Sequence, residues 1–146
     1  MYYGEFTRSG FVKNSSYSEK TECQLNGVHL NTYCKKVLCA ESRPGMGCRE
    51  IPDCVESVLL SSYHCGTVNT DSNPLIDAAN KKQIPVYLTG SGLAVKYESA
   101  SHFKSLGVVP LPQMSPLAAY VKLWMISDGG LDSSLIFKNI GDFIDF

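Results

Sequence analysis

The side chains with the most distinctive chemistry in this sequence are its six cysteines. Five of them lie between residues 34 and 65, spaced as Cys34-x4-Cys39, Cys48-x5-Cys54 and a single Cys65. Tetrahedral zinc sites usually show tighter ligand pairs, such as C-x-x-C, and no such pair occurs here. The spacing therefore argues against a metal site, and we expect no bound metal.

Two further patterns could carry catalysis or bind a cofactor. His64 precedes Cys65, but neighbouring residues of a strand point to opposite faces, whereas a base must contact its nucleophile. Thr89-Gly90-Ser91-Gly92 resembles the start of a dinucleotide-binding turn, yet the third glycine and a following Gly-Lys-Ser/Thr are missing. No G-x-S-x-G elbow is present either. We therefore expect a plain turn, no cofactor and no catalytic residue within these stretches.

Composition limits the classes of protein to consider. The chain has 146 residues, is 44% hydrophobic and carries a net charge of −1 without runs of like charge, which argues against disorder and nucleic-acid binding. No apolar stretch approaches the ~20 residues of a membrane span. The N-terminus lacks the basic and apolar regions of a signal peptide. We therefore expect a cytoplasmic protein with reduced thiols, disulfides being the alternative.

The elements that would position a site are clearest in residues 74–92. Asn73 can cap a helix that begins at Pro74, because an N1 proline gives up only an amide without a partner. A short apolar run, Ile84 to Leu88, then ends at Gly90, as expected for a strand of a parallel sheet covered on both faces. Ligands bind outside the carboxyl ends of such strands, which in this chain are Glu41–Gly47, Ser61–Thr70 and Thr89–Lys96.

The rest of the chain repeats this alternation of strands and helices. We expect strands at 36–40, 55–60 and 108–109. We expect helices at 98–106, from Ser115-Pro116 to a stop at Gly129-Gly130, and from Asp132 to Gly141. In the helix after Pro116, a wide apolar stripe is formed by Leu117, Tyr120, Val121, Trp124 and Met125. The fold class is α/β, three-layer α/β/α with a small, mainly parallel sheet. Residues 1–31 form an N-terminal arm with a hairpin near Ser9–Gly10, and residues 32–146 form the domain.

Several blocks between Lys35 and Asp128 together resemble a known family. They are VESVLLSSYHCGTVN (55–69), IPVYLTGSG (84–92), the turn at 96–98 with LGVV (106–109), and QMSPLAAYVKL (113–123), which is similar to D-M-T-P-E-A-A-x-x-K-L. These blocks resemble the C-terminal domain of bacterial-type L-asparaginases, including the asparaginase-like subunit of tRNA-dependent amidotransferases. The resemblance implies a three-layer α/β/α domain that packs against a larger N-terminal one.

The resemblance also implies what this chain lacks. The family's catalytic threonines lie in its N-terminal domain, in Thr-Gly-Gly-Thr and Gly-Thr-Asp-Thr loops, and nothing here matches either. Its chemistry needs an activated hydroxyl and an oxyanion hole. Thr67, Thr70 and Thr89 lie on expected loops without such partners, so we expect no catalysis by the chain alone.

In the family, the loop after the second strand completes the active site of a neighbouring subunit, and here that loop is 66–69. The resemblance therefore gives three substrate-binding residues: Thr67, Asn69, which matches the substrate-sensing asparagine, and Glu98, near a carboxylate that contacts the substrate amine. Asn69 is alternatively a turn residue, and Glu98 a solvated acid in the first turn of a helix.

Two functions follow. The first is a stand-alone asparaginase C-terminal-like domain that acts as an accessory, dimerisation or substrate-completing half of an amidohydrolase. Its partners are a second copy, forming a homodimer, or a separate catalytic asparaginase-like domain, with asparagine or aspartate as ligand. The alternative is a free-standing binding or regulatory protein, of the immunity type, that reuses this fold.

Overall fold

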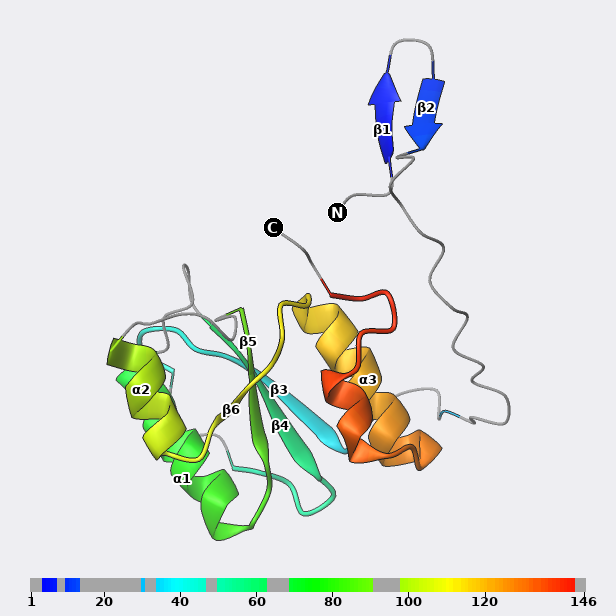
Figure 1. The fold of residues 1–146 in the computed structure, drawn as a ribbon. Coiled ribbons are helices and arrows are strands. Elements are labelled where there is room, and N and C mark those ends of the chain that lie inside the picture. The colour runs from blue at the N-terminus through cyan, green and yellow to red at the C-terminus, as the bar shows by residue number, and fades with distance from the viewer. Residues whose placement is uncertain are drawn as a thin grey trace.

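A computed structural model gives the fold of the chain. It describes residues 4–7, 10–13, 30, 34–46, 50–62, 69–90 and 98–143, with the backbone only for 4–7, 10–13 and 98–100. The N-terminal hairpin that the sequence predicts is present. β1 (Gly4–Thr7) pairs antiparallel with β2 (Gly10–Lys13), and the pair closes at Thr7 and Gly10 (Figure 1).

The domain is built on a parallel sheet of four strands in the order β3-β4-β5-β6. These strands are β3 (Val37–Glu41), β4 (Ser57–Ser61), β5 (Val86–Thr89) and β6 (Val109–Pro110). All three strand pairs are parallel. β4 is central and its first four residues are all buried, the pattern of a strand covered on both faces. The predicted α/β class with a parallel sheet is confirmed.

Helices cover both faces of the sheet (Figure 1). On one face lie α1 (Asn73–Lys81), which follows the short 3-10 helix η1 (Thr70–Ser72), and α2 (Glu98–Ser105). On the other face lie α3 (Pro116–Gly129) and the 3-10 helix η2 (Ser133–Phe137). Among the described helices, none is long and apolar enough to cross a membrane.

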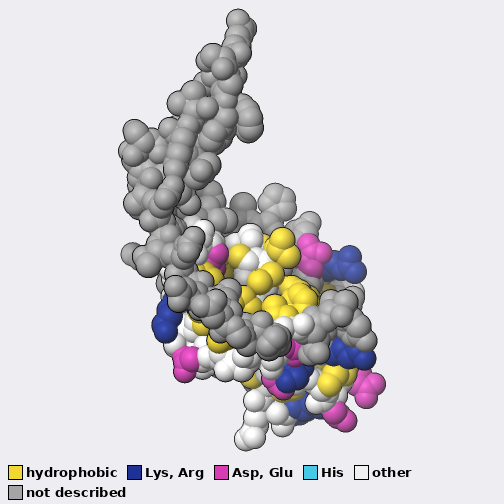
Figure 2. All heavy atoms as spheres, turned by 90° about the vertical axis from the view of Figure 1, so that its right-hand side faces the viewer, with side chains coloured by type: hydrophobic (Ala, Val, Ile, Leu, Met, Phe, Trp, Pro, Cys, Tyr) yellow, Lys and Arg dark blue, Asp and Glu magenta, His cyan; other side chains and the backbone are white. Residues whose placement is uncertain are grey.

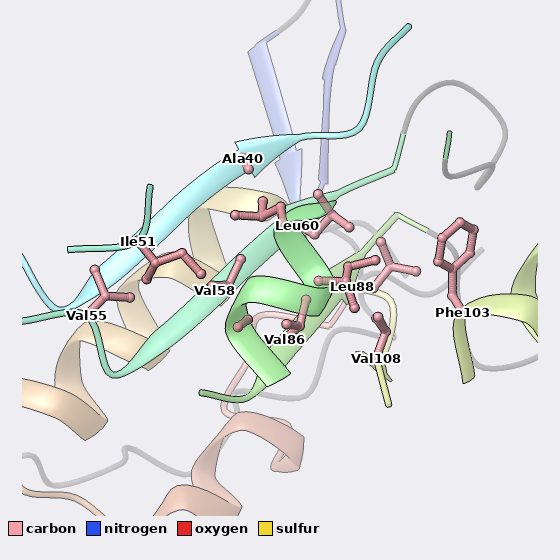
Figure 3. Close-up of a cluster of buried hydrophobic side chains, with 12 residues drawn as sticks. Ala40, Ile51, Val55, Val58, Leu60, Val86, Leu88, Phe103 and Val108 are labelled. Atoms are coloured by element: carbon pink, nitrogen blue, oxygen red, sulfur yellow. The ribbon is translucent and has the colours of Figure 1, made fainter. Parts of the chain in front are cut away.

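Each face of the sheet has its own apolar core. Val58 and Leu60 of β4 and Val86 and Leu88 of β5 point toward α1 and α2, where they meet Phe103 (Figure 3). The intervening strand residues point the other way, because successive side chains of a strand alternate. They form a second core with α3 and η2, whose buried members are Val37, Leu59, Leu111, Met114, Ala119, Leu123 and Ile136.

Two predicted helix boundaries are wrong. Asn73 does not cap α1: it is the first residue of that helix, and the preceding Ser72 makes no side-chain cap bond. The side-chain cap instead lies upstream, where Asn69 caps η1. The last helix, predicted to run from Asp132 to Gly141, is the short 3-10 helix η2. Asp132 does cap it, but η2 ends at Phe137.

The ends of α3 agree with the sequence. Ser115 accepts a hydrogen bond from the Ala118 amide, Pro116 is the first residue, and Gly130 follows the helix with a φ of 64°. The buried face of the helix is less expected. Ala119 and Leu123 are buried, whereas Leu117 and Val121 of the predicted apolar stripe are exposed.

Candidate functional site

The carboxyl ends of β3, β4 and β5 meet at one edge of the sheet, since the three strands are parallel. The register places Glu41 beside Ser61 and Ser61 beside Thr89. Ser61 follows Leu59 by two positions, Thr89 follows Tyr87 by two, and Glu41 follows Val37 by four. Since Val37, Leu59 and Tyr87 belong to the α3-side core or pack against it and strand side chains alternate, all three polar side chains point to the face that α3 covers. A polar row therefore crosses three strands at this edge.

This polar row borders an open cavity of about 470 Å³. The cavity lies between the ends of β3 and β4 and the first residue of α3, and its lining is Cys39, Ala40, Glu41, Ser61, Ser62 and Pro116. Thr89, at the inner end of the row, is fully buried, and its hydroxyl donates a 3.4 Å hydrogen bond to the Ser61 hydroxyl. The cavity thus offers a carboxylate, hydroxyls and a thiol to a small polar ligand.

A second polar network ties the loop after β3 to the segment before α1. Ser42 is fully buried, and its Oγ accepts hydrogen bonds from the Asn69 amide, at 2.7 Å, and from the Ser72 hydroxyl, at 2.9 Å. Asp71 accepts a hydrogen bond from the Gly45 amide at 2.8 Å. Because a buried hydroxyl without partners is costly, this network fixes how the two loops lie.

Asn69 has a defined structural role in this network. Its side-chain carbonyl Oδ1 accepts a 2.8 Å hydrogen bond from the Asp71 amide, which caps η1. Asn69 therefore has the turn role that the sequence analysis gave as the alternative to substrate binding. Since the carbonyl is occupied, the side-chain NH2 group is the part of Asn69 suited to contact a ligand.

The other two predicted site residues are placed only in part. Thr67 lies outside the described residues. Glu98 is the first residue of α2, in the first turn where an acid is favourable, and its side chain lies outside the described part of the chain. The residues that border the cavity were not predicted individually. The available signal was the rule that ligands bind at strand carboxyl ends, which pointed to segments beginning at Glu41, Ser61 and Thr89.

The thiols do not form a recognisable site. Cys34, Cys39 and Cys54 are free, and the remaining three cysteines lie outside the described residues. Cys39 lies in β3 as predicted, but it is exposed at this edge strand. Partial burial, with a smaller contribution from Cys34, raises the pKa of its thiol, so less of the reactive thiolate is present. Within the described ranges, no three His, Cys, Asp or Glu side chains gather as a metal site.

Comparison with known proteins supports the fold. No family model and no curated protein matches the sequence. Among solved structures, the chain is similar to the thermostable L-asparaginase from Thermococcus kodakarensis, with a TM-score of 0.56 and 20% sequence identity. The match covers 76% of this chain and 38% of the L-asparaginase chain. This chain therefore has the fold of one part of an L-asparaginase, and it spans well under half the length of that protein.

Proposed function

We propose that this chain acts as a non-catalytic half of an L-asparaginase-type amidohydrolase and helps to bind the substrate at the carboxyl edge of its sheet. The observation that carries the proposal is the fold match, which covers 38% of an L-asparaginase. It is supported by the 146 residues themselves, in which neither Thr-Gly-Gly-Thr nor Gly-Thr-Asp-Thr occurs. The nucleophile would therefore come from another polypeptide or domain.

The ligand in this proposal is asparagine or aspartate. The NH2 group of Asn69 is a donor suited to the ligand's carboxylate, and the Glu98 carboxylate is suited to its ammonium group. Thr67, two positions before Asn69 in the sequence, would contribute a hydroxyl. The Ser42 network, which holds Asn69 by its backbone amide, supports a positioning role because a site needs its contacting groups fixed before the ligand arrives.

The first test measures ammonia. The purified chain is incubated with L-asparagine or L-glutamine, and we expect no ammonia above a buffer blank. Ammonia release that is abolished by Thr67→Ala or Thr89→Ala would contradict the non-catalytic role.

The second test measures ligand binding by NMR of the backbone amides. Millimolar L-aspartate or L-asparagine should shift the amides of Ser42, Asn69 and Asp71, and succinate, which lacks the amine, should shift them less. Asn69→Asp keeps the capping oxygen but replaces the NH2 donor, so it should abolish the shifts while the spectrum stays that of the folded chain. If no amide of this edge moves with any of the ligands, the substrate-completing role is wrong, and the binding or regulatory alternative is favoured.

A further inference from the structure

The cavity at the carboxyl edge contains a charged group without a counter-charge. The Glu41 carboxylate lines this cavity, and within the part of the chain that the structure describes it makes no hydrogen bond or ion pair. The described residues that line the cavity include no Lys, Arg or His. A carboxylate at the wall of a cavity that has no basic side chain attracts cations and repels anions.

Two hydroxyl groups also line the cavity. Ser61 is the register partner of Glu41, and Ser62 follows it. The Thr89 hydroxyl donates to the Ser61 hydroxyl, which keeps a second lone pair for another donor. Gly90 leaves room for the Ser62 hydroxyl, because a Cβ at Gly90 would fall on its oxygen. The wall therefore combines a carboxylate with two neutral acceptors, which suits an ammonium group and its three N–H donors.

The start of α3 borders the cavity but is poorly equipped to bind an anion. Helix N-termini favour anions when their first amides are free. In α3, Pro116 has no N–H, and the Ala118 amide already donates to the Ser115 hydroxyl. The Ala119 amide donates to the Ser115 carbonyl. Only the Leu117 amide is left in the first turn, so the cavity favours a cation over a carboxylate or phosphate.

The rest of the lining is apolar. It consists of the Pro116 ring, Ala40 and the Cys39 thiol, which behaves as a small hydrophobic group. Beside Pro116, Leu117 is 71% exposed, and Figure 2 shows hydrophobic side chains gathered on the side of the molecule where α3 and η2 lie. The volume of about 470 Å³ is within the range of small-molecule sites and far exceeds an ammonium ion. The ligand therefore has a hydrocarbon part.

From these observations we infer that the cavity between β3, β4 and α3 binds a small primary alkylamine. The amine is protonated at neutral pH. Its ammonium group donates to the Glu41 carboxylate and to the hydroxyls of Ser61 and Ser62. Its hydrocarbon chain lies along Cys39 and Pro116.

Other ligand classes suit this lining less well. A free amino acid carries a carboxylate next to its ammonium group, and the described lining residues offer that carboxylate no basic side chain. A divalent metal ion prefers several carboxylate or carbonyl ligands, whereas Glu41 is the single carboxylate among the described lining residues.

The amine site is separate from the one that the proposed function uses. Glu41 ends β3 and Ser42 follows it, so their side chains point to opposite faces of the sheet. Glu41 points to the α3 side, whereas Ser42 accepts a hydrogen bond from the Asn69 amide on the side of α1. The inference therefore goes beyond the proposed function and does not require it.

The test is an NMR titration of the full chain at neutral pH with pentylamine, pentanol and L-norleucine, which share the same hydrocarbon chain. Pentylamine should shift the backbone amides of Glu41, Ser61 and Ser62 with a dissociation constant on the order of 1–10 mM, as expected for so small a ligand. Pentanol lacks the charge, and L-norleucine adds a carboxylate. Each should therefore bind about fivefold more weakly or worse.

Glu41→Gln keeps the shape of the side chain and removes its charge, so it should raise the dissociation constant for pentylamine by about fivefold or more. Asp77→Asn removes an exposed carboxylate from α1 and is the matched control, which should leave pentylamine binding unchanged. Asn69→Asp should also leave it unchanged. The amide spectrum of each variant shows directly that the chain is folded.

The inference would be overturned if pentylamine shifted neither Ser61 nor Ser62, or if Glu41→Gln bound it like the intact chain. Equal affinity for pentylamine and L-norleucine would contradict it as well. Each site has its own variant, so the two proposals fail separately. Loss of aspartate binding with pentylamine binding retained contradicts only the proposed function, and the reverse contradicts only the amine site.

Discussion

Lys122 of α3 and Asp142 near the C-terminus form a buried ion pair, with Nζ and Oδ2 2.8 Å apart and side-chain exposures of 2% and 15%. The Asp142 oxygen lacks a well-aligned hydrogen bond, so the contact is chiefly electrostatic. The Lys122 ammonium also donates to the Lys138 carbonyl at 2.5 Å and lies 4.8 Å from the centre of the Phe143 ring. One buried lysine thus holds the segment after η2 against α3.

Lys122→Met should destabilise the domain by about 3–5 kcal/mol, because it leaves the Asp142 carboxylate buried without a counter-charge. Chemical denaturation followed by circular dichroism measures the free energy of unfolding. The double variant Lys122→Met/Asp142→Leu should recover most of this loss, since an apolar pair can replace a buried ion pair. A single variant as stable as the original chain would show that Asp142 is not held in this place.

Ser42→Ala should destabilise the domain by about 1–3 kcal/mol, because the Asn69 amide and the Ser72 hydroxyl both lose their acceptor. Hydrogen exchange provides a local measurement: the Asn69 amide should exchange faster in the variant. Ser133→Ala, at an exposed position of η2, is the control and should change neither quantity. Unchanged exchange at Asn69 in Ser42→Ala would contradict the role given to Ser42.

Gly90→Ala should be more destabilising than Gly45→Ala. Both glycines have positive φ, 83° and 73°, so an added Cβ strains either one by about 1–2 kcal/mol. A Cβ at Gly45 meets nothing within 4 Å, but one at Gly90 falls on the Ser62 hydroxyl oxygen. Adding Ser62→Ala should reduce the loss at Gly90 toward that at Gly45, as measured by thermal or urea unfolding. Equal losses for the two single variants would mean that Ser62 moves away freely.

Cys39 should react with iodoacetamide more slowly than a free thiol such as glutathione at neutral pH. Its pKa is raised by partial burial and then by Cys34, so a smaller fraction is thiolate. The reaction rate, followed by mass spectrometry, should rise with pH, and the midpoint of this rise should lie above the ordinary thiol pKa.

Mass spectrometry under non-reducing conditions also tests the state of all the thiols, and we expect all six cysteines to be unpaired. A midpoint below the ordinary value, or paired cysteines, would contradict this prediction.

Several features of the fold were predictable from the sequence because they depend on local chemistry. Buried parallel strands appear in a sequence as short apolar runs. The runs at 36–40, 55–60 and 84–88 predict the ends of β3, β4 and β5 to within two residues. Ser115-Pro116 and Gly130 mark the ends of α3, because a cap needs a side-chain oxygen and the end of a helix needs a positive φ. The segments at the carboxyl edge of the sheet could then be predicted, because they are the residues that follow these strands.

The faces and partners of these elements were decided by tertiary structure. α3 is apolar all round, so periodicity could not show that Ala119 and Leu123, rather than Leu117 and Val121, face the sheet. Asn69 and Asn73 are both good capping residues, so the sequence does not decide between them. The hydrogen bond from the Asn69 amide to Ser42, 27 positions away, helps to place the cap at Asn69 rather than at Asn73. Lys122 and Asp142 are likewise ordinary charged residues in the sequence. Only the packing of the chain removes them from water and makes each depend on the other.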